Sequence, residues 1–399
     1  MPGLLTYGRE TVAPGAHVTE TAADTAERIL VAAITDPGAR PHEPAPTVLD
    51  AIRTHTLAPL AWDTFVSAGH RDAWPASLRS TLRAAAAAHV LVSELVNAEL
   101  RRVIASLGDA GLRAALVKGA AIAHTHYRYP HWRPRGDSDL VIRAADRDAI
   151  AGTLSALGYE RSGAIDGDLL TQQSQWRRPL GGAVRHTVDV HWRVFNPHVL
   201  ATVLPVERLL ARAVPVRALG THAMCACPVD ALLLACVHRV AHHAEDDENL
   251  IWAYDIHLLT SSLDAREAHE FAQTAAASAV RALCAHGIAV ARARFGTPVP
   301  SAVEDVLAVP AAGEASRIFL ERSRRQVDLL ASDLLALGGW RARARLLRQH
   351  LFPSPAYIRT KYGARRAALL PFAYARRIAA GVPGWLVRRE RGAGARRSR

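Results

Sequence analysis

The chain has 399 residues, half of them hydrophobic, which suffices for one large or two medium domains with buried cores. It contains no uncharged apolar run of about 18 residues, and its start lacks the basic and apolar segments of a secretion signal, so we expect neither a transmembrane helix nor a signal peptide. Four cysteines are too few for a disulfide-based fold and favour a reducing, cytoplasmic location.

The positive charge is concentrated at one end of the chain. Residues 341–399 carry 15 Arg and one Lys against a single acid, a net charge of +15. The formal total is +12, so the rest of the chain carries −3. This mildly acidic body argues against a nucleic-acid-binding core, and we expect no sequence-specific nucleic acid as a partner.

Helical periodicity dominates the first hundred residues. Residues 21–36 and 46–68 show helical spacing, and the strongest segment is 76–107, which is rich in Ala and repeats Leu, Val and Ile at intervals of three and four. The sequence therefore predicts a helical N-terminal region over residues 1–107.

A unit of alternating strands and helices is predicted over residues 108–200. The last of its strands is the clearest, because apolar and polar residues alternate along "TVDVHWRVF". The predicted elements, in chain order, are strand 112–118, helix 120–127, strand 138–143, helix 145–157 and strand 187–195. The predicted fold class is therefore α+β, with a small mixed-sheet core flanked by mainly helical regions.

The rest of the chain divides into a predicted helical domain over residues 201–340 and a basic C-terminal extension over residues 341–399. The extension mixes Leu, Phe, Tyr and Trp with paired arginines. Such segments are typical of proteins that lie on anionic membrane surfaces, which would make the protein peripheral at the inner membrane face. A solvated, partly disordered extension is an equally good interpretation, and nucleic-acid binding without a recognisable reader motif is a third.

Three aspartates are candidates for a metal site. Asp137 and Asp139 lie two residues apart at the start of the strand predicted over 138–143, so they project from one face. Carboxylates that close raise each other's pKa unless a cation lies between them, and Mg²⁺ prefers carboxylates, waters and phosphates. Asp189 is the candidate third carboxylate, because its apolar neighbours face the other way; His191 shares its face.

A phosphate-binding turn is predicted ahead of these aspartates. Lys118 and Gly119 stand where a strand ends and a helix opens, which leaves backbone N–H groups available to phosphate oxygens. Arg133 and Arg135, just before the aspartates, are candidates for further phosphate contacts. Asp255, in "WAYDIHLL", is either a residue of the cleft or an acid paired with an arginine.

The order of Lys118-Gly119, Tyr127, "RPRGDSDLV", "GYE" and "VDVHW" resembles the nucleotidyltransferase superfamily of the polymerase-β type. Within it, the pattern is similar to an uncharacterised bacterial nucleotidyltransferase family often found near polysaccharide or peptide-natural-product genes. The resemblance is strongest over residues 112–195 and continues more weakly at "HRVAHHAEDDENLIWAYDIHLL" and "RFGTPVP".

The resemblance implies transfer of a nucleoside monophosphate from an NTP such as ATP to the hydroxyl of an unknown acceptor, with Mg²⁺ or Mn²⁺ as cofactor. It implies that three carboxylates are catalytic metal ligands, namely Asp137, Asp139 and Asp189. The residues that it implies for nucleotide and phosphate binding are Lys118, Gly119 and Arg133, to which the sequence adds Arg135. Tyr127 and His191 are candidate supporting groups beside them.

The chain departs from the superfamily pattern at two positions. Ala120 follows the turn glycine where Gly or Ser is usual, and Ser138 separates the two aspartates where an apolar residue is usual. A second interpretation is therefore a catalytically weak or inactive nucleotide-binding scaffold of a biosynthetic assembly at a membrane surface.

Overall fold

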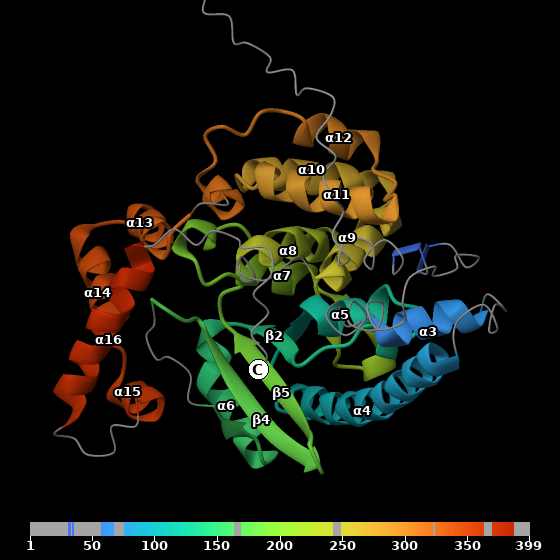
Figure 1. The fold of residues 1–399 in the computed structure, drawn as a ribbon, viewed down its shortest axis with the longest axis horizontal. Helices are drawn as coiled ribbons and strands as arrows, with labels where there is room; N and C mark the ends of the chain where they lie inside the picture. Colours follow the sequence, from blue (N-terminus) through green and yellow to red (C-terminus); the bar gives the residue numbers. More distant parts are fainter. Residues whose placement is uncertain are drawn as a thin grey trace, which may run out of the picture.

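The computed structural model describes residues 31–32, 34–35, 57–67, 76–162, 169–241, 249–321, 324–362 and 369–386. Within these residues, a single sheet of seven strands has the order β3-β4-β5-β2-β1-β7-β6 (Figure 1). Strand β2 pairs antiparallel with β1 and parallel with β5, which confirms the predicted mixed sheet. The strands are β1 (Ala114–Val117), β2 (Ser138–Ile142), β3 (Glu160–Arg161), β4 (Gln173–Gly181), β5 (Val184–His191), β6 (Val214–Pro215) and β7 (Met224–Cys225).

Helices cover both faces of this sheet, and the strand residues alternate between two cores. Leu140 and Val188 pack with α4 and α6 on one face, whereas Val117 and Val141 belong to the core formed with α7 to α11 on the other. The helices up to α9 are α3 (Ala58–Ser67), α4 (Ala76–Asp109), α5 (Lys118–Thr125), α6 (Arg147–Ala156), α7 (Val206–Arg212), α8 (Pro228–Ala241) and α9 (Leu250–Ser262). The later helices are α10 (Ala265–Ala277), α11 (Arg281–Phe295), α12 (Ser301–Leu307), α13 (Gln326–Ala336), α14 (Trp340–Leu351), α15 (Pro355–Tyr362) and α16 (Leu370–Leu386).

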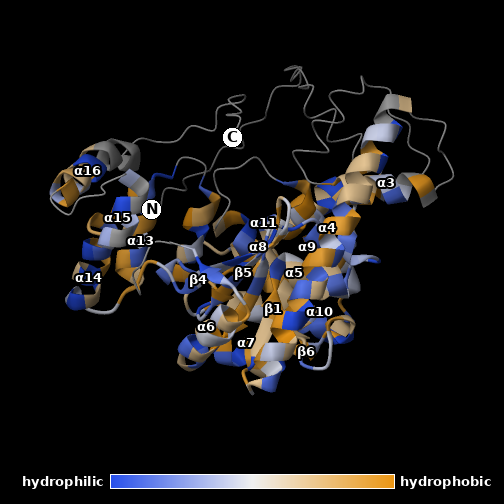
Figure 2. Ribbon diagram, turned by 90° about the horizontal axis from the view of Figure 1, so that it is seen from below, coloured by the Kyte–Doolittle hydropathy of each residue, from blue (hydrophilic) through white to orange (hydrophobic). Residues whose placement is uncertain are grey.

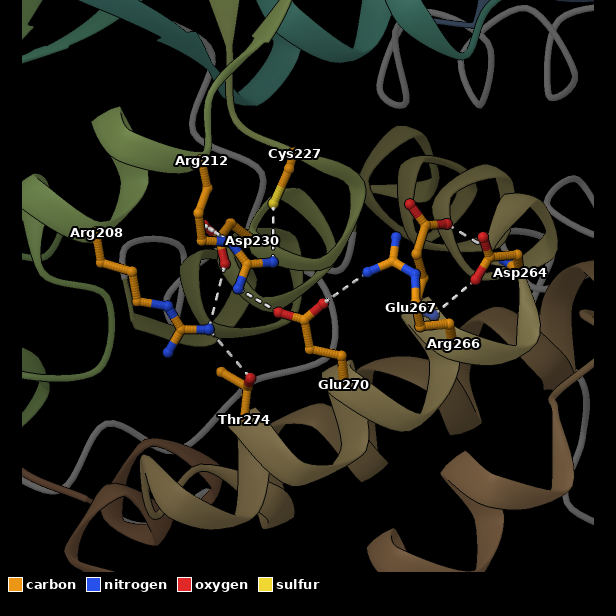
Figure 3. Close-up of polar contacts among 9 residues, drawn as sticks. All are labelled: Arg208, Arg212, Cys227, Asp230, Asp264, Arg266, Glu267, Glu270 and Thr274. Atoms are coloured by element: carbon orange, nitrogen blue, oxygen red, sulfur yellow. Dashed lines mark hydrogen bonds and ion pairs between the residues drawn. The ribbon is translucent and has the colours of Figure 1, made fainter.

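A network of charged side chains joins α7, which lies against the sheet, to α8 and α10 (Figure 3). Arg212 on α7 forms an ion pair with Glu270 on α10 and lies 3.6 Å from the buried carboxylate of Asp230 on α8. Arg208, one turn earlier, donates a hydrogen bond of 3.1 Å to Thr274 on α10. These contacts fix the helical part of the molecule to the sheet that carries the candidate site.

The predicted elements of the core are confirmed to within a few residues, but four strands were not predicted. The alternation of polar and apolar residues does not predict strand β4, because this strand is largely polar and contains Pro179. Strands β3, β6 and β7 have two residues each, too few for any pattern. Strands β6 and β7 extend the same sheet from beyond residue 200. The predicted domain boundary at residue 200 stays a prediction.

The terminal regions are described in part. The helix predicted over 21–36 is described at 31–32 and 34–35, which are helical. The helix predicted over 46–68 is described at 57–67 and contains α3, and its other residues lie outside the described ranges. The predicted basic extension contains most of α14 together with α15 and α16, up to residue 386. Among the described residues, no helix is both long and apolar enough to cross a membrane.

Candidate active site

The register of the central strands brings two of the three predicted carboxylates together. Parallel pairing of β2 with β5 places Asp139 directly beside Asp189, and antiparallel pairing with β1 places Asp139 opposite Val117. Asp139, Asp189 and His191 are buried, and their ligand atoms lie within 4.8 Å of one another. Asp137 immediately precedes β2, and its charge interacts with the charges of Asp139 and Asp189.

Asp139 is the carboxylate whose charge is compensated within the protein. Its Oδ1 accepts a hydrogen bond of 2.7 Å from Lys118 Nζ and one of 2.8 Å from His191 Nε2. Burial alone would raise the pKa of Asp139, but the Lys118 charge and the His191 hydrogen bond hold it well below its usual range. Asp139 is therefore ionised in the folded protein.

Asp137 and Asp189 are in the opposite situation. Burial, reinforced by the charges of Asp139 and Asp189, raises the pKa of Asp137 to about 7. Burial and Asp139 likewise raise the pKa of Asp189, whose Oδ1 is buried without a hydrogen-bond partner. An orphaned carboxylate oxygen among mutually repelling acids is what a bound divalent cation would satisfy, so the residues present fit a metal.

The turn between β1 and α5 has an unusual backbone. Lys118, the first residue of α5, has a φ of 54°, in the left-handed region. A Cβ on Gly119 would lie 3.3 Å from the guanidinium of Arg133, so glycine lets Arg133 pack closely behind the turn. The N-cap of α5, Val117, offers no side-chain hydrogen bond, which leaves the first N–H groups of the helix to other acceptors.

A family model described as uncharacterised nucleotidyltransferase matches residues 41–296, more than half of the chain. The chain belongs to this nucleotidyltransferase family. The matched range spans every residue of the site and the whole sheet, and it ends at α11, before helices α12 to α16. A comparison with curated proteins gave no match. Family membership makes the protein a transferase, and its buried Asp-Asp-His group fits a metal-dependent one.

Arg133 of this nucleotidyltransferase is paired across the fold. Its Nε and Nη2 donate to the Asp255 carboxylate on α9 at 2.8 to 3.0 Å, and the Tyr127 hydroxyl donates to the same carboxylate at 2.8 Å. All three side chains are buried. The interpretation of Asp255 as an acid paired with an arginine is thus confirmed, whereas phosphate binding by Arg133 stays a prediction.

Arg135 points toward α4. It donates to Asn97 Oδ1, which also contacts His124 Nε2 at 3.2 Å. Burial, together with the charge of Arg133, lowers the pKa of Arg135 to about 10. Nothing in the sequence singled out Asn97, since a polar residue on a long amphipathic helix carries no motif. Phosphate binding by Arg135 also stays a prediction.

The nucleotidyltransferase sheet carries a second polar cluster on its other face. Ser138 Oγ lies 3.0 Å from His186 Nε2, and the Tyr159 hydroxyl contacts His186 Nδ1 at 2.5 Å and donates to Glu99 at 3.0 Å. Because that hydroxyl has one proton, His186 Nδ1 donates to it and Nε2 accepts from Ser138. Ser138 is thus buried between the aspartates and points away from them.

Proposed function

We propose that the protein transfers a nucleoside monophosphate from an NTP to an acceptor hydroxyl and releases pyrophosphate. The observation that carries this proposal is the pairing of Asp139 with Asp189, which leaves one Asp189 oxygen unpartnered beside an ionised carboxylate. Membership of a nucleotidyltransferase family supports the reaction class. We expect the acceptor to belong to polysaccharide or peptide natural-product biosynthesis.

The proposed metal ligands are Asp137, Asp139 and Asp189, with Mg²⁺ or Mn²⁺ as the ion. When bound, the ion would neutralise the triphosphate and the charge that develops on the leaving pyrophosphate. Asp137 and Asp189, whose pKa values are raised without a cation, would both ionise beside it. His191 would hold the Asp139 carboxylate in place through its Nε2 hydrogen bond.

Asp189 is proposed to act on the acceptor. Ionised beside the cation, the Asp189 carboxylate can accept the hydrogen bond of the attacking hydroxyl and take up its proton. The acceptor oxygen then bonds to the α-phosphorus, the bond from that phosphorus to the pyrophosphate oxygen breaks, and the hydroxyl proton passes to Asp189. Positioning and electrostatic neutralisation supply most of the acceleration in such displacements.

The triphosphate is proposed to bind at the start of α5. Lys118 supplies a positive charge there, and the uncapped N–H groups that follow Gly119 supply hydrogen bonds. Arg133, held by Asp255 and packed against Gly119, would support the shape of this turn from behind. Arg135 would act near Asp137, whose charge favours the ionised form of Arg135.

Calorimetric titration of the full chain with each NTP in the presence of Mg²⁺ tests the assignment. We expect binding that requires the metal and is lost in the Asp137→Ala/Asp139→Ala variant, because the remaining ligands are too few. The matched control, Asp146→Ala/Asp148→Ala, removes two carboxylates from the start of α6, near the end of β2, and should bind as the wild type does. Equal affinity in wild type and the first variant would overturn the metal site.

Turnover of labelled NTPs with cell extract then separates the two functions. Label transfer to an acceptor supports the enzyme. Metal-dependent binding without any transfer or pyrophosphate release supports the nucleotide-binding scaffold, for which Ala120 and Ser138 are the sequence arguments.

A further inference from the structure

Helices α13 to α16 form a unit at one side of the molecule, beyond the range that the family model matches (Figures 1 and 2). Eleven large hydrophobic side chains are exposed in the described part of the chain, and six of them belong to this unit. These six are Leu335, Trp340, Leu347, Phe352, Leu369 and Phe372. Exposed aromatic and aliphatic side chains concentrated on one unit indicate a binding surface.

Helix α14 carries apolar side chains both on the side that packs against the protein and on the side that faces outward. Its protein-facing side carries Leu346, which is buried, and Gln349, which accepts a hydrogen bond from Leu169 N. Its outer side carries Trp340, 73% exposed, and Leu347, two turns later on the same face. Exposed arginines flank this apolar stripe along the helix, at positions 341, 345 and 348.

Helix α16 repeats the arrangement on a smaller scale. Phe372 is 74% exposed, and Arg376 follows one turn later on the same face. Residues 340–386 contain ten basic residues and no acidic one. Helices α14 to α16 therefore present large apolar side chains among many basic ones.

We propose that this basic apolar surface, formed by α13 to α16 with Trp340 and Phe372 as its anchors, binds an anionic membrane surface in the plane of the headgroups. Aromatic and leucine side chains would enter the boundary between headgroups and acyl chains, and the arginines would contact lipid phosphates. The exposed leucines favour an anionic membrane over nucleic acid, because aliphatic side chains pack favourably against acyl chains and have no partner on a nucleic-acid backbone. This binding is independent of the proposed reaction.

Flotation of the full chain with vesicles tests the proposal. We expect the protein to float with phosphatidylcholine vesicles that contain phosphatidylglycerol and to remain in solution with phosphatidylcholine alone. Since each arginine near an anionic surface contributes roughly fivefold in affinity, Arg341→Gln/Arg348→Gln should weaken binding about 25-fold. Trp340→Ala/Phe372→Ala should weaken it by about tenfold or more, with the charge unchanged.

Matched controls separate this surface from general stickiness. Leu91→Ala/Leu95→Ala removes two exposed leucines of α4, and Arg143→Gln/Arg147→Gln removes two exposed arginines near α6. Both variants should float as the wild type does, and all variants should keep the wild-type circular dichroism spectrum. A chain that ends at residue 386 should still float, because the anchors precede that point.

Three results would overturn the proposal. The first is equal distribution of the full chain between anionic and neutral vesicles. The second is a loss of flotation in the α4 control as large as in Trp340→Ala/Phe372→Ala. The third is anionic-vesicle binding that is insensitive to the aromatic substitutions while duplex DNA binds more tightly, which would assign the surface to nucleic acid.

Discussion

The two faces of the β2–β5 pair carry opposite kinds of polar chemistry. On one face, Asp139 and Asp189 are packed side by side with His191, and one carboxylate oxygen has no hydrogen-bond partner. On the other face, Ser138 and His186 open a chain of hydrogen bonds that ends on Glu99. Each polar group in this series of hydrogen bonds has a partner, and Glu99 is further paired with two arginines.

This difference separates a structural network from a candidate site. Buried polar groups that are all satisfied make a core more specific, whereas buried acids left in repulsion cost stability and persist where function requires them. The face that carries Asp139, Asp189 and His191, the aspartate face, is therefore the candidate ligand site. The opposite face, with Ser138 and His186, is the serine face. The serine face holds the same two strands in register from behind.

The largest expected effect comes from a substitution on the aspartate face, which should lower the rate of nucleotidyl transfer. Asp189→Asn keeps the size of the side chain but removes a charge that burial and Asp139 make unfavourable, so nucleotidyl transfer should fall about 10²- to 10³-fold. The melting temperature should stay the same or rise by about 1–3 °C. Pyrophosphate release and scanning calorimetry measure the two quantities. Loss of stability together with activity would show that Asp189 is structural.

A second effect concerns the serine face and pH. Burial lowers the pKa of His186 to about 4, while an unfolded histidine has a pKa near 6.5, so the unfolded state binds the proton first as pH falls. His186 therefore withdraws stability between about pH 6.5 and pH 4, by up to about 3 kcal/mol. Urea unfolding at pH 7 and pH 5 should show a smaller pH dependence in His186→Gln than in wild type.

The control for this titration is His269→Gln, which alters an exposed histidine on α10. It should keep the pH dependence of the wild type. If His186→Gln retains that dependence as well, the acid sensitivity of the fold arises elsewhere, and the two faces differ less than proposed.

The smallest expected effect also lies on the serine face. Tyr159→Phe removes the hydroxyl that links Glu99 to His186 and should cost about 1–2 kcal/mol of unfolding free energy. NTP affinity should be unchanged, since this chain of hydrogen bonds faces away from the aspartates. Tyr129→Phe, at a tyrosine that is 40% exposed, is the matched control. Weakened NTP binding in Tyr159→Phe would mean that the two faces are coupled.

The sequence by itself determined which residues share a face. Because side chains alternate along a strand, the pattern of "TVDVHW" was enough to place Asp189 and His191 together, and the spacing of Asp137 and Asp139 placed those two at one strand end. The strand–helix junction at Lys118 followed from the same local reasoning. Long helices such as α4 were also predicted, since their periodicity extends over many turns.

Only the tertiary structure decided which faces meet. The register that sets Asp139 beside Asp189 depends on pairing between segments 50 residues apart in sequence, and a slip of one residue would have turned the carboxylates away. The pairing of Arg133 with Asp255 spans 122 positions and has no local signature. Sequence periodicity reports local geometry alone, whereas partner choice depends on long-range packing, and so the three aspartates were predicted as one metal site, but the register that brings Asp139 beside Asp189 came only from the fold.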